Sequence, residues 1–108
     1  MARVHKSQVT QRKRLTDSHR DLLIAELRAA PGLAAEYLSA AAEDQDPRVY
    51  LIALRTVAEA QGMAKVAKAA GVPRESLYRA LSSSGNPRFS TLHAILRATG
   101  LKFAVENI

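Results

Sequence analysis

Residues Gly62–Leu81 read GMAKVAKAAGVPRESLYRAL and are the most informative part of the sequence. It predicts two short helices joined by a tight turn, which is the layout of a helix-turn-helix. A small residue is needed where the helices cross closely, and Ala67 supplies it, while Gly71 lets the chain reverse sharply. Val72 just after the turn and Leu77 in the second helix provide apolar anchors. The stretch therefore predicts a helix-turn-helix inside a mainly helical protein.

The outward positions of the second helix carry side chains that suit DNA. Arg74 and Arg79 can fork to guanine or phosphate, and Glu75 can accept from cytosine but otherwise repels phosphate. A helix of this kind fits the major groove of B-DNA. The alternative is an ordinary helical hairpin with a solvated charged face. The candidate DNA-binding residues are Lys65, Arg74, Glu75, Ser76, Tyr78, Arg79, Ser82, Asn86 and Arg88. Among them, Lys65, Arg88 and the loop of residues 82–86 are expected to contact phosphates.

Helices are also predicted on both sides of this stretch. Thr16-Asp17-Ser18 offers capping oxygens for a first helix, which Pro31-Gly32 ends. Asp46-Pro47 starts another, because Asp can cap it while Pro occupies its first position. Ser90 is expected to cap the last helix, which Gly100 ends. The predicted helices span about residues 18–30, 33–42, 47–61, 63–70, 73–81 and 90–99.

The last residues alternate between apolar and other side chains, which predicts a short C-terminal β-strand over residues 101–106. No other strand is expected in the chain, and an isolated strand is unstable. Pairing with the same strand of a second copy across a two-fold axis would satisfy its backbone. Helix-turn-helix proteins also usually read two half-sites. We therefore predict a homodimer with Leu101, Phe103 and Val105 at its interface.

The net charge of +6 is unevenly distributed along the chain. Residues 1–14 carry five cations and no acid, residues 15–46 seven acids and two cations, and residues 47–108 nine cations and three acids. A basic C-terminal part is expected of a domain that binds a polyanion, whereas DNA would repel the acidic part. The chain is therefore divided into a flexible basic tail (1–14), acidic N-terminal helices (15–46) and a helix-turn-helix domain with a C-terminal strand (47–108).

The run Gly62–Leu81, continued by GNPRFSTL at residues 85–92, resembles the HigA-like antitoxins of addiction modules. The helix-turn-helix of these antitoxins is of the Xre or phage-repressor type, with a lambda-repressor-like fold. AEYLSAA at residues 35–41 and Asp46-Pro47 extend the likeness over most of the chain. The resemblance implies a protein that binds double-stranded operator DNA, represses its own operon and neutralises a RelE/ParE-like toxin of the HigB type. Pro73 departs from the Ser or Asn often found there in Xre-type domains and removes a side-chain cap.

The acidic segment has an obvious use against such a toxin. A ribonuclease toxin must be basic around its RNA-binding cleft, so an acidic partner would be steered toward it. Two amphipathic helices could supply the buried anchors that an interface needs. The candidate toxin-binding residues are Leu23, Leu27, Glu36, Tyr37, Glu43 and Asp44. The alternative is that both helices only pack on the helix-turn-helix domain of a stand-alone Xre-type repressor without a toxin partner.

Other classes of protein find no support in the sequence. Without Cys the chain forms neither a disulfide nor a Cys-based zinc site. Its longest apolar run, Val49–Leu54, has six residues, against the roughly 20 that span a bilayer, and no secretory signal follows the basic N-terminus. His5, His19 and His93 lie far apart in the sequence, and no base is placed to activate Ser82–Ser84. We expect a cytoplasmic protein with no metal, no cofactor, no membrane partner and no enzymatic activity.

Overall fold

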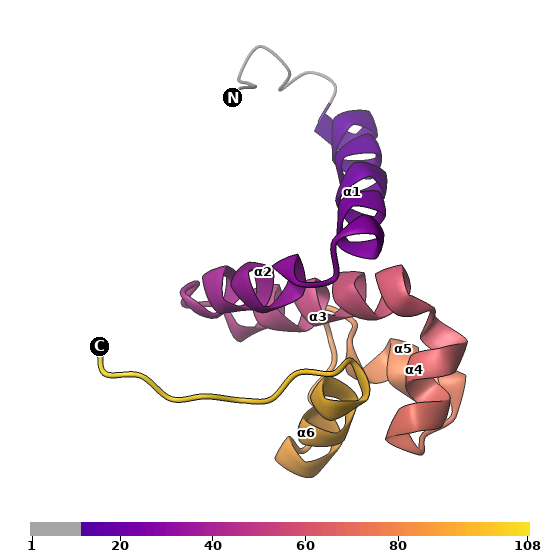
Figure 1. Cartoon of the computed structure of the whole chain (residues 1–108), viewed down its shortest axis with the longest axis vertical. Helices are drawn as coiled ribbons and strands as arrows, with labels where there is room; N and C mark the ends of the chain where they lie inside the picture. The colour runs from indigo at the N-terminus through magenta and orange to yellow at the C-terminus, as the bar shows by residue number, and fades with distance from the viewer. Residues whose placement is uncertain (1–11) are drawn as a thin grey trace.

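The computed structural model describes residues 12–108, which form six α-helices joined by short loops (Figure 1). The predicted mainly helical class is therefore confirmed. None of these helices is both long enough and apolar enough to cross a bilayer. The helices are α1 (Arg12–Ala29), α2 (Leu33–Ala42), α3 (Pro47–Gln61), α4 (Met63–Ala70), α5 (Arg74–Ala80) and α6 (Phe89–Ala98).

Helix α3 is the central element of the fold. Asp46 caps it by accepting from the backbone N–H of Arg48 at 3.0 Å, and Pro47 takes the first position as predicted. α3 packs against α1, α2 and α4. Figure 1 shows α2 running along α3, while α1 stands at a steep angle to it. Because partners surround it, α3 buries seven side chains in its fifteen residues.

All six helices contribute buried side chains to the core. Its largest fully buried side chains include Leu54 of α3, Leu77 of α5 and Ile95 of α6. Complete burial of such a side chain contributes about 1.5–3 kcal/mol. A helix as short as α5, with seven residues, is not stable by itself. The burial of Leu77 therefore holds α5 in place and determines which of its faces points outward.

The turn between α4 and α5 has the predicted geometry. Gly71 adopts the left-handed conformation with φ 75° and ψ 29°, which costs other residues about 1–2 kcal/mol. The N–H of Val72 donates to the carbonyl of Ala67 at 3.0 Å, and the N–H of Gly71 to that of Lys68 at 3.2 Å. These bonds close α4 and direct the chain into α5. The predicted pair of short helices with its turn at Gly71-Val72 is confirmed.

Helix α1 begins earlier than predicted. Thr16-Asp17-Ser18, expected to cap it, lies inside the helix, whose first residue is Arg12. Residues 12–14 therefore belong to α1 and not to the expected basic tail. Arg, Lys and Leu are good helix formers, so the helix extends upstream of the polar residues that could have started it. The rest of the expected tail, residues 1–11, lies outside the described residues.

The C-terminal part of the chain differs from the prediction in two places. Arg88 occupies the N-cap position of α6, and Ser90, expected there, lies in the first turn. Residues 101–108 contain no strand and lead away from α6 as an extended segment (Figure 1). The strand predicted over residues 101–106 is therefore wrong for the single chain. Alternating side chains indicate two faces but supply no partner, and the described chain offers no second strand to pair with.

Candidate nucleic-acid interface

The predicted DNA-contacting side chains of α5 lie on its exposed face. Arg74, Glu75 and Arg79 are exposed, while Leu77 is fully buried. Nη2 of Arg79 donates to Oγ of Ser76 at 3.2 Å. The acid stands in the first turn of the helix and Arg79 in the last, which suits the helix dipole. α5 therefore presents a polar face with two arginines to the outside.

Tyr78 lies beside this face and is half-buried. The Cζ atom of Arg74 is 5.7 Å from the centre of the Tyr78 ring, and the Cζ atom of Arg55 is 5.3 Å from it. A guanidinium within about 6 Å of a ring centre is attracted to it. Arg55 belongs to α3, so cations from two helices contact one ring of α5. The sequence analysis missed Arg55, for which the only signal is the i,i+4 spacing to Glu59.

The loop after α5 lies close against that helix. Oγ of Ser82 donates to the carbonyl of Arg79 at 2.9 Å, and the N–H of Gly85 donates to that of Ser82 at 2.9 Å. A Cβ atom on Gly85 would overlap the backbone oxygens of Arg79 and Ala80, so only glycine allows this approach. The remaining predicted DNA-binding residues, Lys65, Asn86 and Arg88, are exposed.

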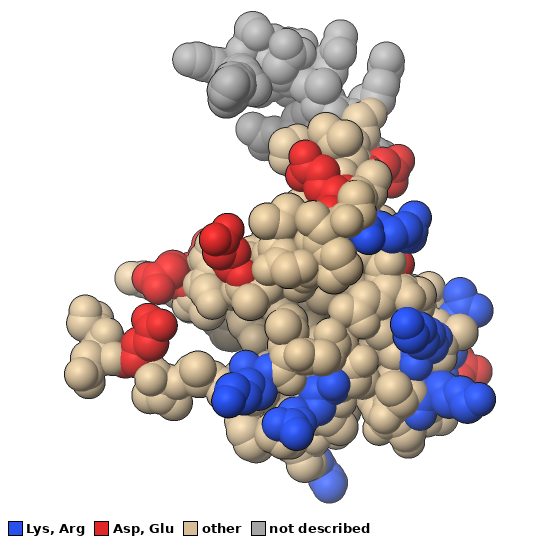
Figure 2. All heavy atoms as spheres, viewed as in Figure 1, with Lys and Arg blue, Asp and Glu red and all other residues tan. Residues whose placement is uncertain are grey.

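Basic and acidic side chains occupy different parts of the surface (Figure 2). In this view most Lys and Arg lie over the part formed by α4, α5 and α6. Most Asp and Glu lie over α1, α2 and the C-terminal segment. The uneven charge along the sequence thus becomes a separation of charge in space. A polyanion can approach the basic part while the acidic part points away from it.

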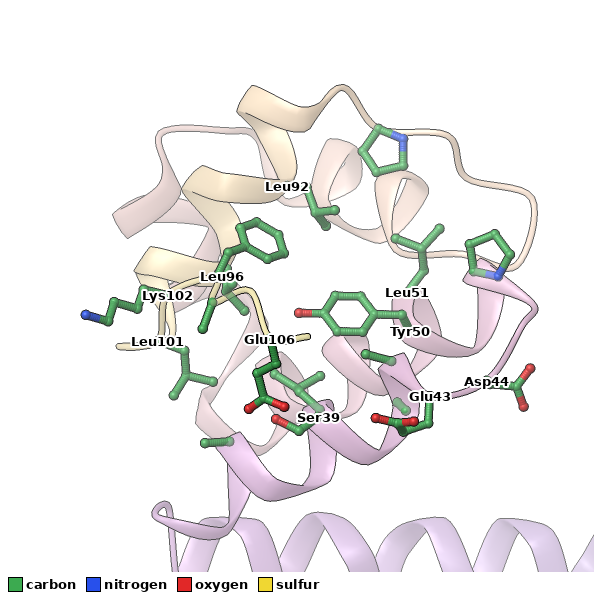
Figure 3. Close-up of a pocket in the computed structure, with 18 of the residues that line it drawn as sticks. Ser39, Glu43, Asp44, Tyr50, Leu51, Leu92, Leu96, Leu101, Lys102 and Glu106 are labelled. Carbon is green, nitrogen blue, oxygen red and sulfur yellow. The ribbon is translucent and has the colours of Figure 1, made fainter. Parts of the chain in front are cut away.

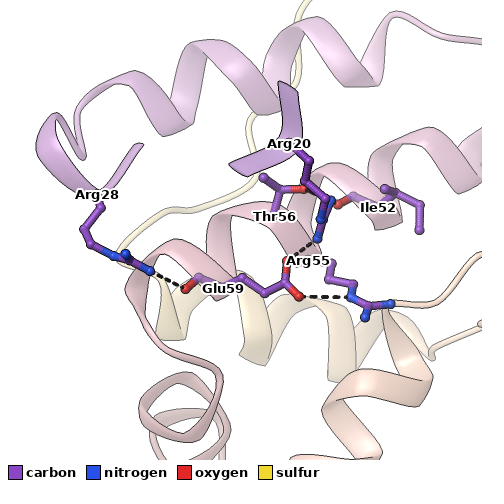
Figure 4. A network of polar contacts seen from close by, with 6 residues as sticks. All are labelled: Arg20, Arg28, Ile52, Arg55, Thr56 and Glu59. Atoms are coloured by element: carbon purple, nitrogen blue, oxygen red, sulfur yellow. Dashed lines mark hydrogen bonds and ion pairs between the residues drawn. The ribbon is translucent and has the colours of Figure 1, made fainter. Parts of the chain in front are cut away.

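A polar network joins α1 to α3 (Figure 4). Arg20 of α1 donates from Nη1 to Oγ1 of Thr56 at 2.8 Å and from Nη2 to Oε1 of Glu59. The other oxygen of Glu59, Oε2, accepts from Nε of Arg55 at 3.5 Å. Thr56 is buried, and its hydroxyl donates to the carbonyl of Ile52 at 3.0 Å. One carboxylate of α3 therefore serves two arginines from two helices, an arrangement that the sequence analysis also missed.

The predicted toxin-binding residues are divided between the core and the surface. Leu27 is only 4% exposed, and Leu23 and Tyr37 are half-buried against the core. From residue 18 to the end of α2, the exposed large apolar side chains are Leu22 and Leu33, and Leu33 is also one of the apolar residues predicted to anchor the toxin. The acidic candidates Glu36, Glu43 and Asp44 are exposed. The apolar stripes of α1 and α2 thus face mainly the chain's own core, and their acids face outward.

Two of the three predicted dimerisation residues contact their own chain. Leu101 and Phe103 pack against the core, and Phe103 stacks on Phe89 with ring centres 5.3 Å apart. Val105 is 97% exposed. Tyr50 also stacks on Phe103, with ring centres 6.5 Å apart. Burial raises the pKa of the Tyr50 hydroxyl above its ordinary value.

A groove of about 810 Å³ lies between the end of α2, the start of α3 and the C-terminal segment (Figure 3). Tyr50 and Leu92 contribute to its apolar lining, and three acidic residues and one basic residue also line it: Glu43, Asp44, Glu106 and Lys102. Within the described part of the chain, no three His, Asp or Glu side chains are grouped as a metal site. The groove therefore combines an apolar surface with negative charge.

The chain matches one family model and one known protein over most of its length. A family model described as "probable addiction module antidote protein" matches residues 20–107. A protein of Haemophilus influenzae described as "Uncharacterized protein" is 34% identical over 93 residues, which cover 86% of this chain and 96% of that protein. No solved structure matches the chain significantly.

Proposed function

The chain belongs to the addiction module antidote family, and from this membership we propose that it is the antitoxin of a type II toxin–antitoxin module. It binds double-stranded operator DNA as a homodimer, represses its own operon and neutralises a RelE/ParE-like toxin of the HigB type. It acts in the cytoplasm by binding and not by catalysis. The observation that carries the DNA-binding part is the exposed face of α5, with Arg74 and Arg79 outside and Leu77 buried.

In this proposal α5 enters the major groove. Arg74 and Arg79 read guanines, and each bidentate contact discriminates against a wrong base by about 1–3 kcal/mol. Glu75 disfavours phosphate and so opposes indiscriminate binding. Lys65 precedes α5 in the sequence, Arg88 follows it, and both are exposed. They contact phosphates and add affinity without sequence preference.

Two copies of the chain act together on the operator. A recognition helix of seven residues covers only a few base pairs, and two half-sites about one helical turn apart give a longer site. Residues 104–108 are exposed, which makes this end of the chain available for a contact between the two copies. Val105 is the predicted interface residue whose exposure suits this contact best.

The DNA-binding part is tested with labelled DNA from upstream of the protein's own gene, by fluorescence anisotropy. Replacing both Arg74 and Arg79 by alanine should weaken operator binding about 30-fold or more, if each contact contributes at least about 1 kcal/mol. Replacing Arg97 and Lys102 by alanine removes the same charge from outside the predicted face and serves as the control. It should weaken operator and scrambled DNA alike and only slightly. Equal losses for the two double variants would mean that α5 does not read the operator.

The toxin-binding part is tested in the full chain. Leu27 and Leu38 are buried core residues, so deleting residues 15–46 would expose the core as well as remove the acids. Changing the exposed Glu36, Glu43 and Asp44 to lysine keeps the core intact. This triple variant should lose protection of cells that express the product of the neighbouring gene, yet keep operator binding. If it still protects the cells, the acidic surface is not the toxin interface.

One observation favours a second candidate function, a stand-alone repressor without a toxin. Leu27 of α1 and Leu38 of α2 pack into the core, so these helices already have a structural use in the single chain. The same growth assay separates the two functions with the unmodified protein. A repressor without a toxin binds its operator but gives no protection against the neighbouring gene product.

A further inference from the structure

Glu59 divides its carboxylate between two helices (Figure 4). Oε1 accepts from Arg20 of α1, and Oε2 accepts from Arg55 of α3. The side chains of Arg20, Glu59 and Arg55 are 31%, 22% and 33% exposed, respectively. Solvent and salt therefore screen these pairs less than pairs on the open surface. Two cations compete for one carboxylate at a site to which water has limited access.

The line of contacts continues from Arg55 to α5. The guanidinium of Arg55 lies 5.3 Å from the centre of the Tyr78 ring, and that of Arg74 lies 5.7 Å from the same centre. Arg20 on α1 is thereby connected to Tyr78 on α5 through Glu59 and Arg55. The connection runs from the acidic part of the molecule to the face proposed to contact DNA.

We propose that Glu59 and Arg55 form a relay that positions Tyr78 for DNA, and that the docking of α1 through Arg20 sets this position. The inference rests on the proposed DNA-binding role of α5. Arg20, Glu59 and Arg55 are positioning residues, which act through the Tyr78 ring. A partner that takes up Arg20, or moves α1 away from α3, changes the DNA-contacting face without touching it.

The direction of the effect follows from the shared carboxylate. When Arg20 is withdrawn, Glu59 keeps a single cationic partner. A free carboxylate can take an arginine in a bidentate fork, and Nε of Arg55 is already 3.5 Å from Oε2. This pairing draws the guanidinium toward Glu59 and away from the Tyr78 ring, which loses one cation–π contact. Operator binding becomes weaker when Arg20 is absent.

Arg28 provides a matched control on the same helix. It also docks α1 on α3, through donation from Nε to the carbonyl of Ala60 at 3.1 Å and from Nη2 to that of Glu59 at 3.4 Å. Both acceptors are backbone oxygens, so Arg28 does not share the Glu59 carboxylate. Removing Arg28 takes away these two bonds but leaves Arg20 on the Glu59 carboxylate, so α1 stays docked and the relay to Tyr78 stays intact.

The test is a double-mutant cycle on operator affinity with the full chain. Its members are the wild type, Arg20→Gln, Tyr78→Leu and the double variant. Arg20 and Tyr78 have no direct contact in the network, and distant independent sites have additive effects. The relay instead predicts that the weakening caused by Arg20→Gln shrinks at least about threefold once Tyr78 is leucine. The same cycle with Arg28→Gln should be additive.

A second readout needs no DNA and only one substitution. In the free protein with labelled tyrosines, Arg20→Gln should shift the NMR signals of the Tyr78 ring, and Arg28→Gln should leave them in place. Additive effects in the Arg20 cycle, or unshifted ring signals, overturn the relay. If the wild type binds no operator but the ring signals shift as expected, the proposed function fails and the positioning of Tyr78 stands.

Discussion

Thr56→Val removes one hydroxyl from the joint between α1 and α3 and keeps the shape of the side chain. Thr56 is 1% exposed, and its Oγ1 accepts from Nη1 of Arg20 at 2.8 Å and donates to the carbonyl of Ile52 at 3.0 Å. That carbonyl keeps its helical bond to the N–H of residue 56, so the loss falls on Arg20. Hydrogen bonds to charged groups contribute about 1.5–3 kcal/mol. Because Arg20 is 31% exposed and keeps its ion pair with Glu59, we expect the free energy of unfolding to fall by about 1 kcal/mol.

The assay is urea and thermal unfolding of the full chain, where about 1 kcal/mol lowers the melting temperature by about 4 °C. Thr99→Val is the matched control. Its buried hydroxyl donates to the carbonyl of Leu96 at 2.6 Å, and this oxygen also accepts from the N–H of Thr99 at 3.0 Å. No charged group loses a partner, so we expect a change within about 0.5 kcal/mol. Equal losses in the two variants would refute the reasoning that the bond from Arg20 holds α1 on α3.

Two glycines and one cap give further predictions. Gly71→Ala should cost only about 1–2 kcal/mol and keep operator binding, because its Cβ atom meets nothing within 4 Å and only the positive φ is strained. Gly85→Ala should displace the loop after α5 and therefore weaken operator binding. If anisotropy titrations show that Gly71→Ala weakens operator binding more than Gly85→Ala does, this reasoning is wrong. Hydrogen bonding from the Arg48 side chain lowers the pKa of Asp46, so the folded state favours its carboxylate. The stability that this cap adds is therefore present at neutral pH and is lost as pH falls below about 3.9. At pH 7, Asp46→Ala should have a lower melting temperature than the wild type, and this difference should disappear in acid. A difference that is unchanged well below about pH 3.9 would contradict the role given to the Asp46 carboxylate.

Features that depend on local chemistry could be predicted from the sequence. Asp46-Pro47 starts α3 because a carboxylate and a residue without an N–H both suit that position. Gly71 ends α4 because it adopts a positive φ without strain. The start of α1 could not be placed in this way. Several residues before Ser18 are good helix formers, and their combined propensity outweighed a single capping signal.

Features that depend on which surfaces pack together could not be predicted from the sequence. The apolar spacing of Leu23 and Leu27 indicates a buried stripe, but it does not tell a partner protein from the chain's own α3. The alternation in residues 101–106 has the same ambiguity. Arg20 meets Glu59 across 39 positions of the sequence, and nothing local selects that pair among the charged residues. Only the i,i+4 pair of Arg55 and Glu59 was open to prediction.

The way the helices pack also affects how the chain folds as it is made. The most closely packed pairs are α1–α3, α2–α3, α3–α4, α4–α5 and α4–α6, all neighbours along the chain or one helix removed. Helical domains with such low contact order fold in microseconds to milliseconds. Helices α1 to α3 are complete at Gln61, while the ribosome adds the remaining residues at about 5–20 per second. At that rate Gln61 leaves the ribosome about 1–4 seconds before Ala80, the last residue of α5, does. A partner of the acidic α1 and α2 can therefore reach the nascent chain before DNA can reach α5.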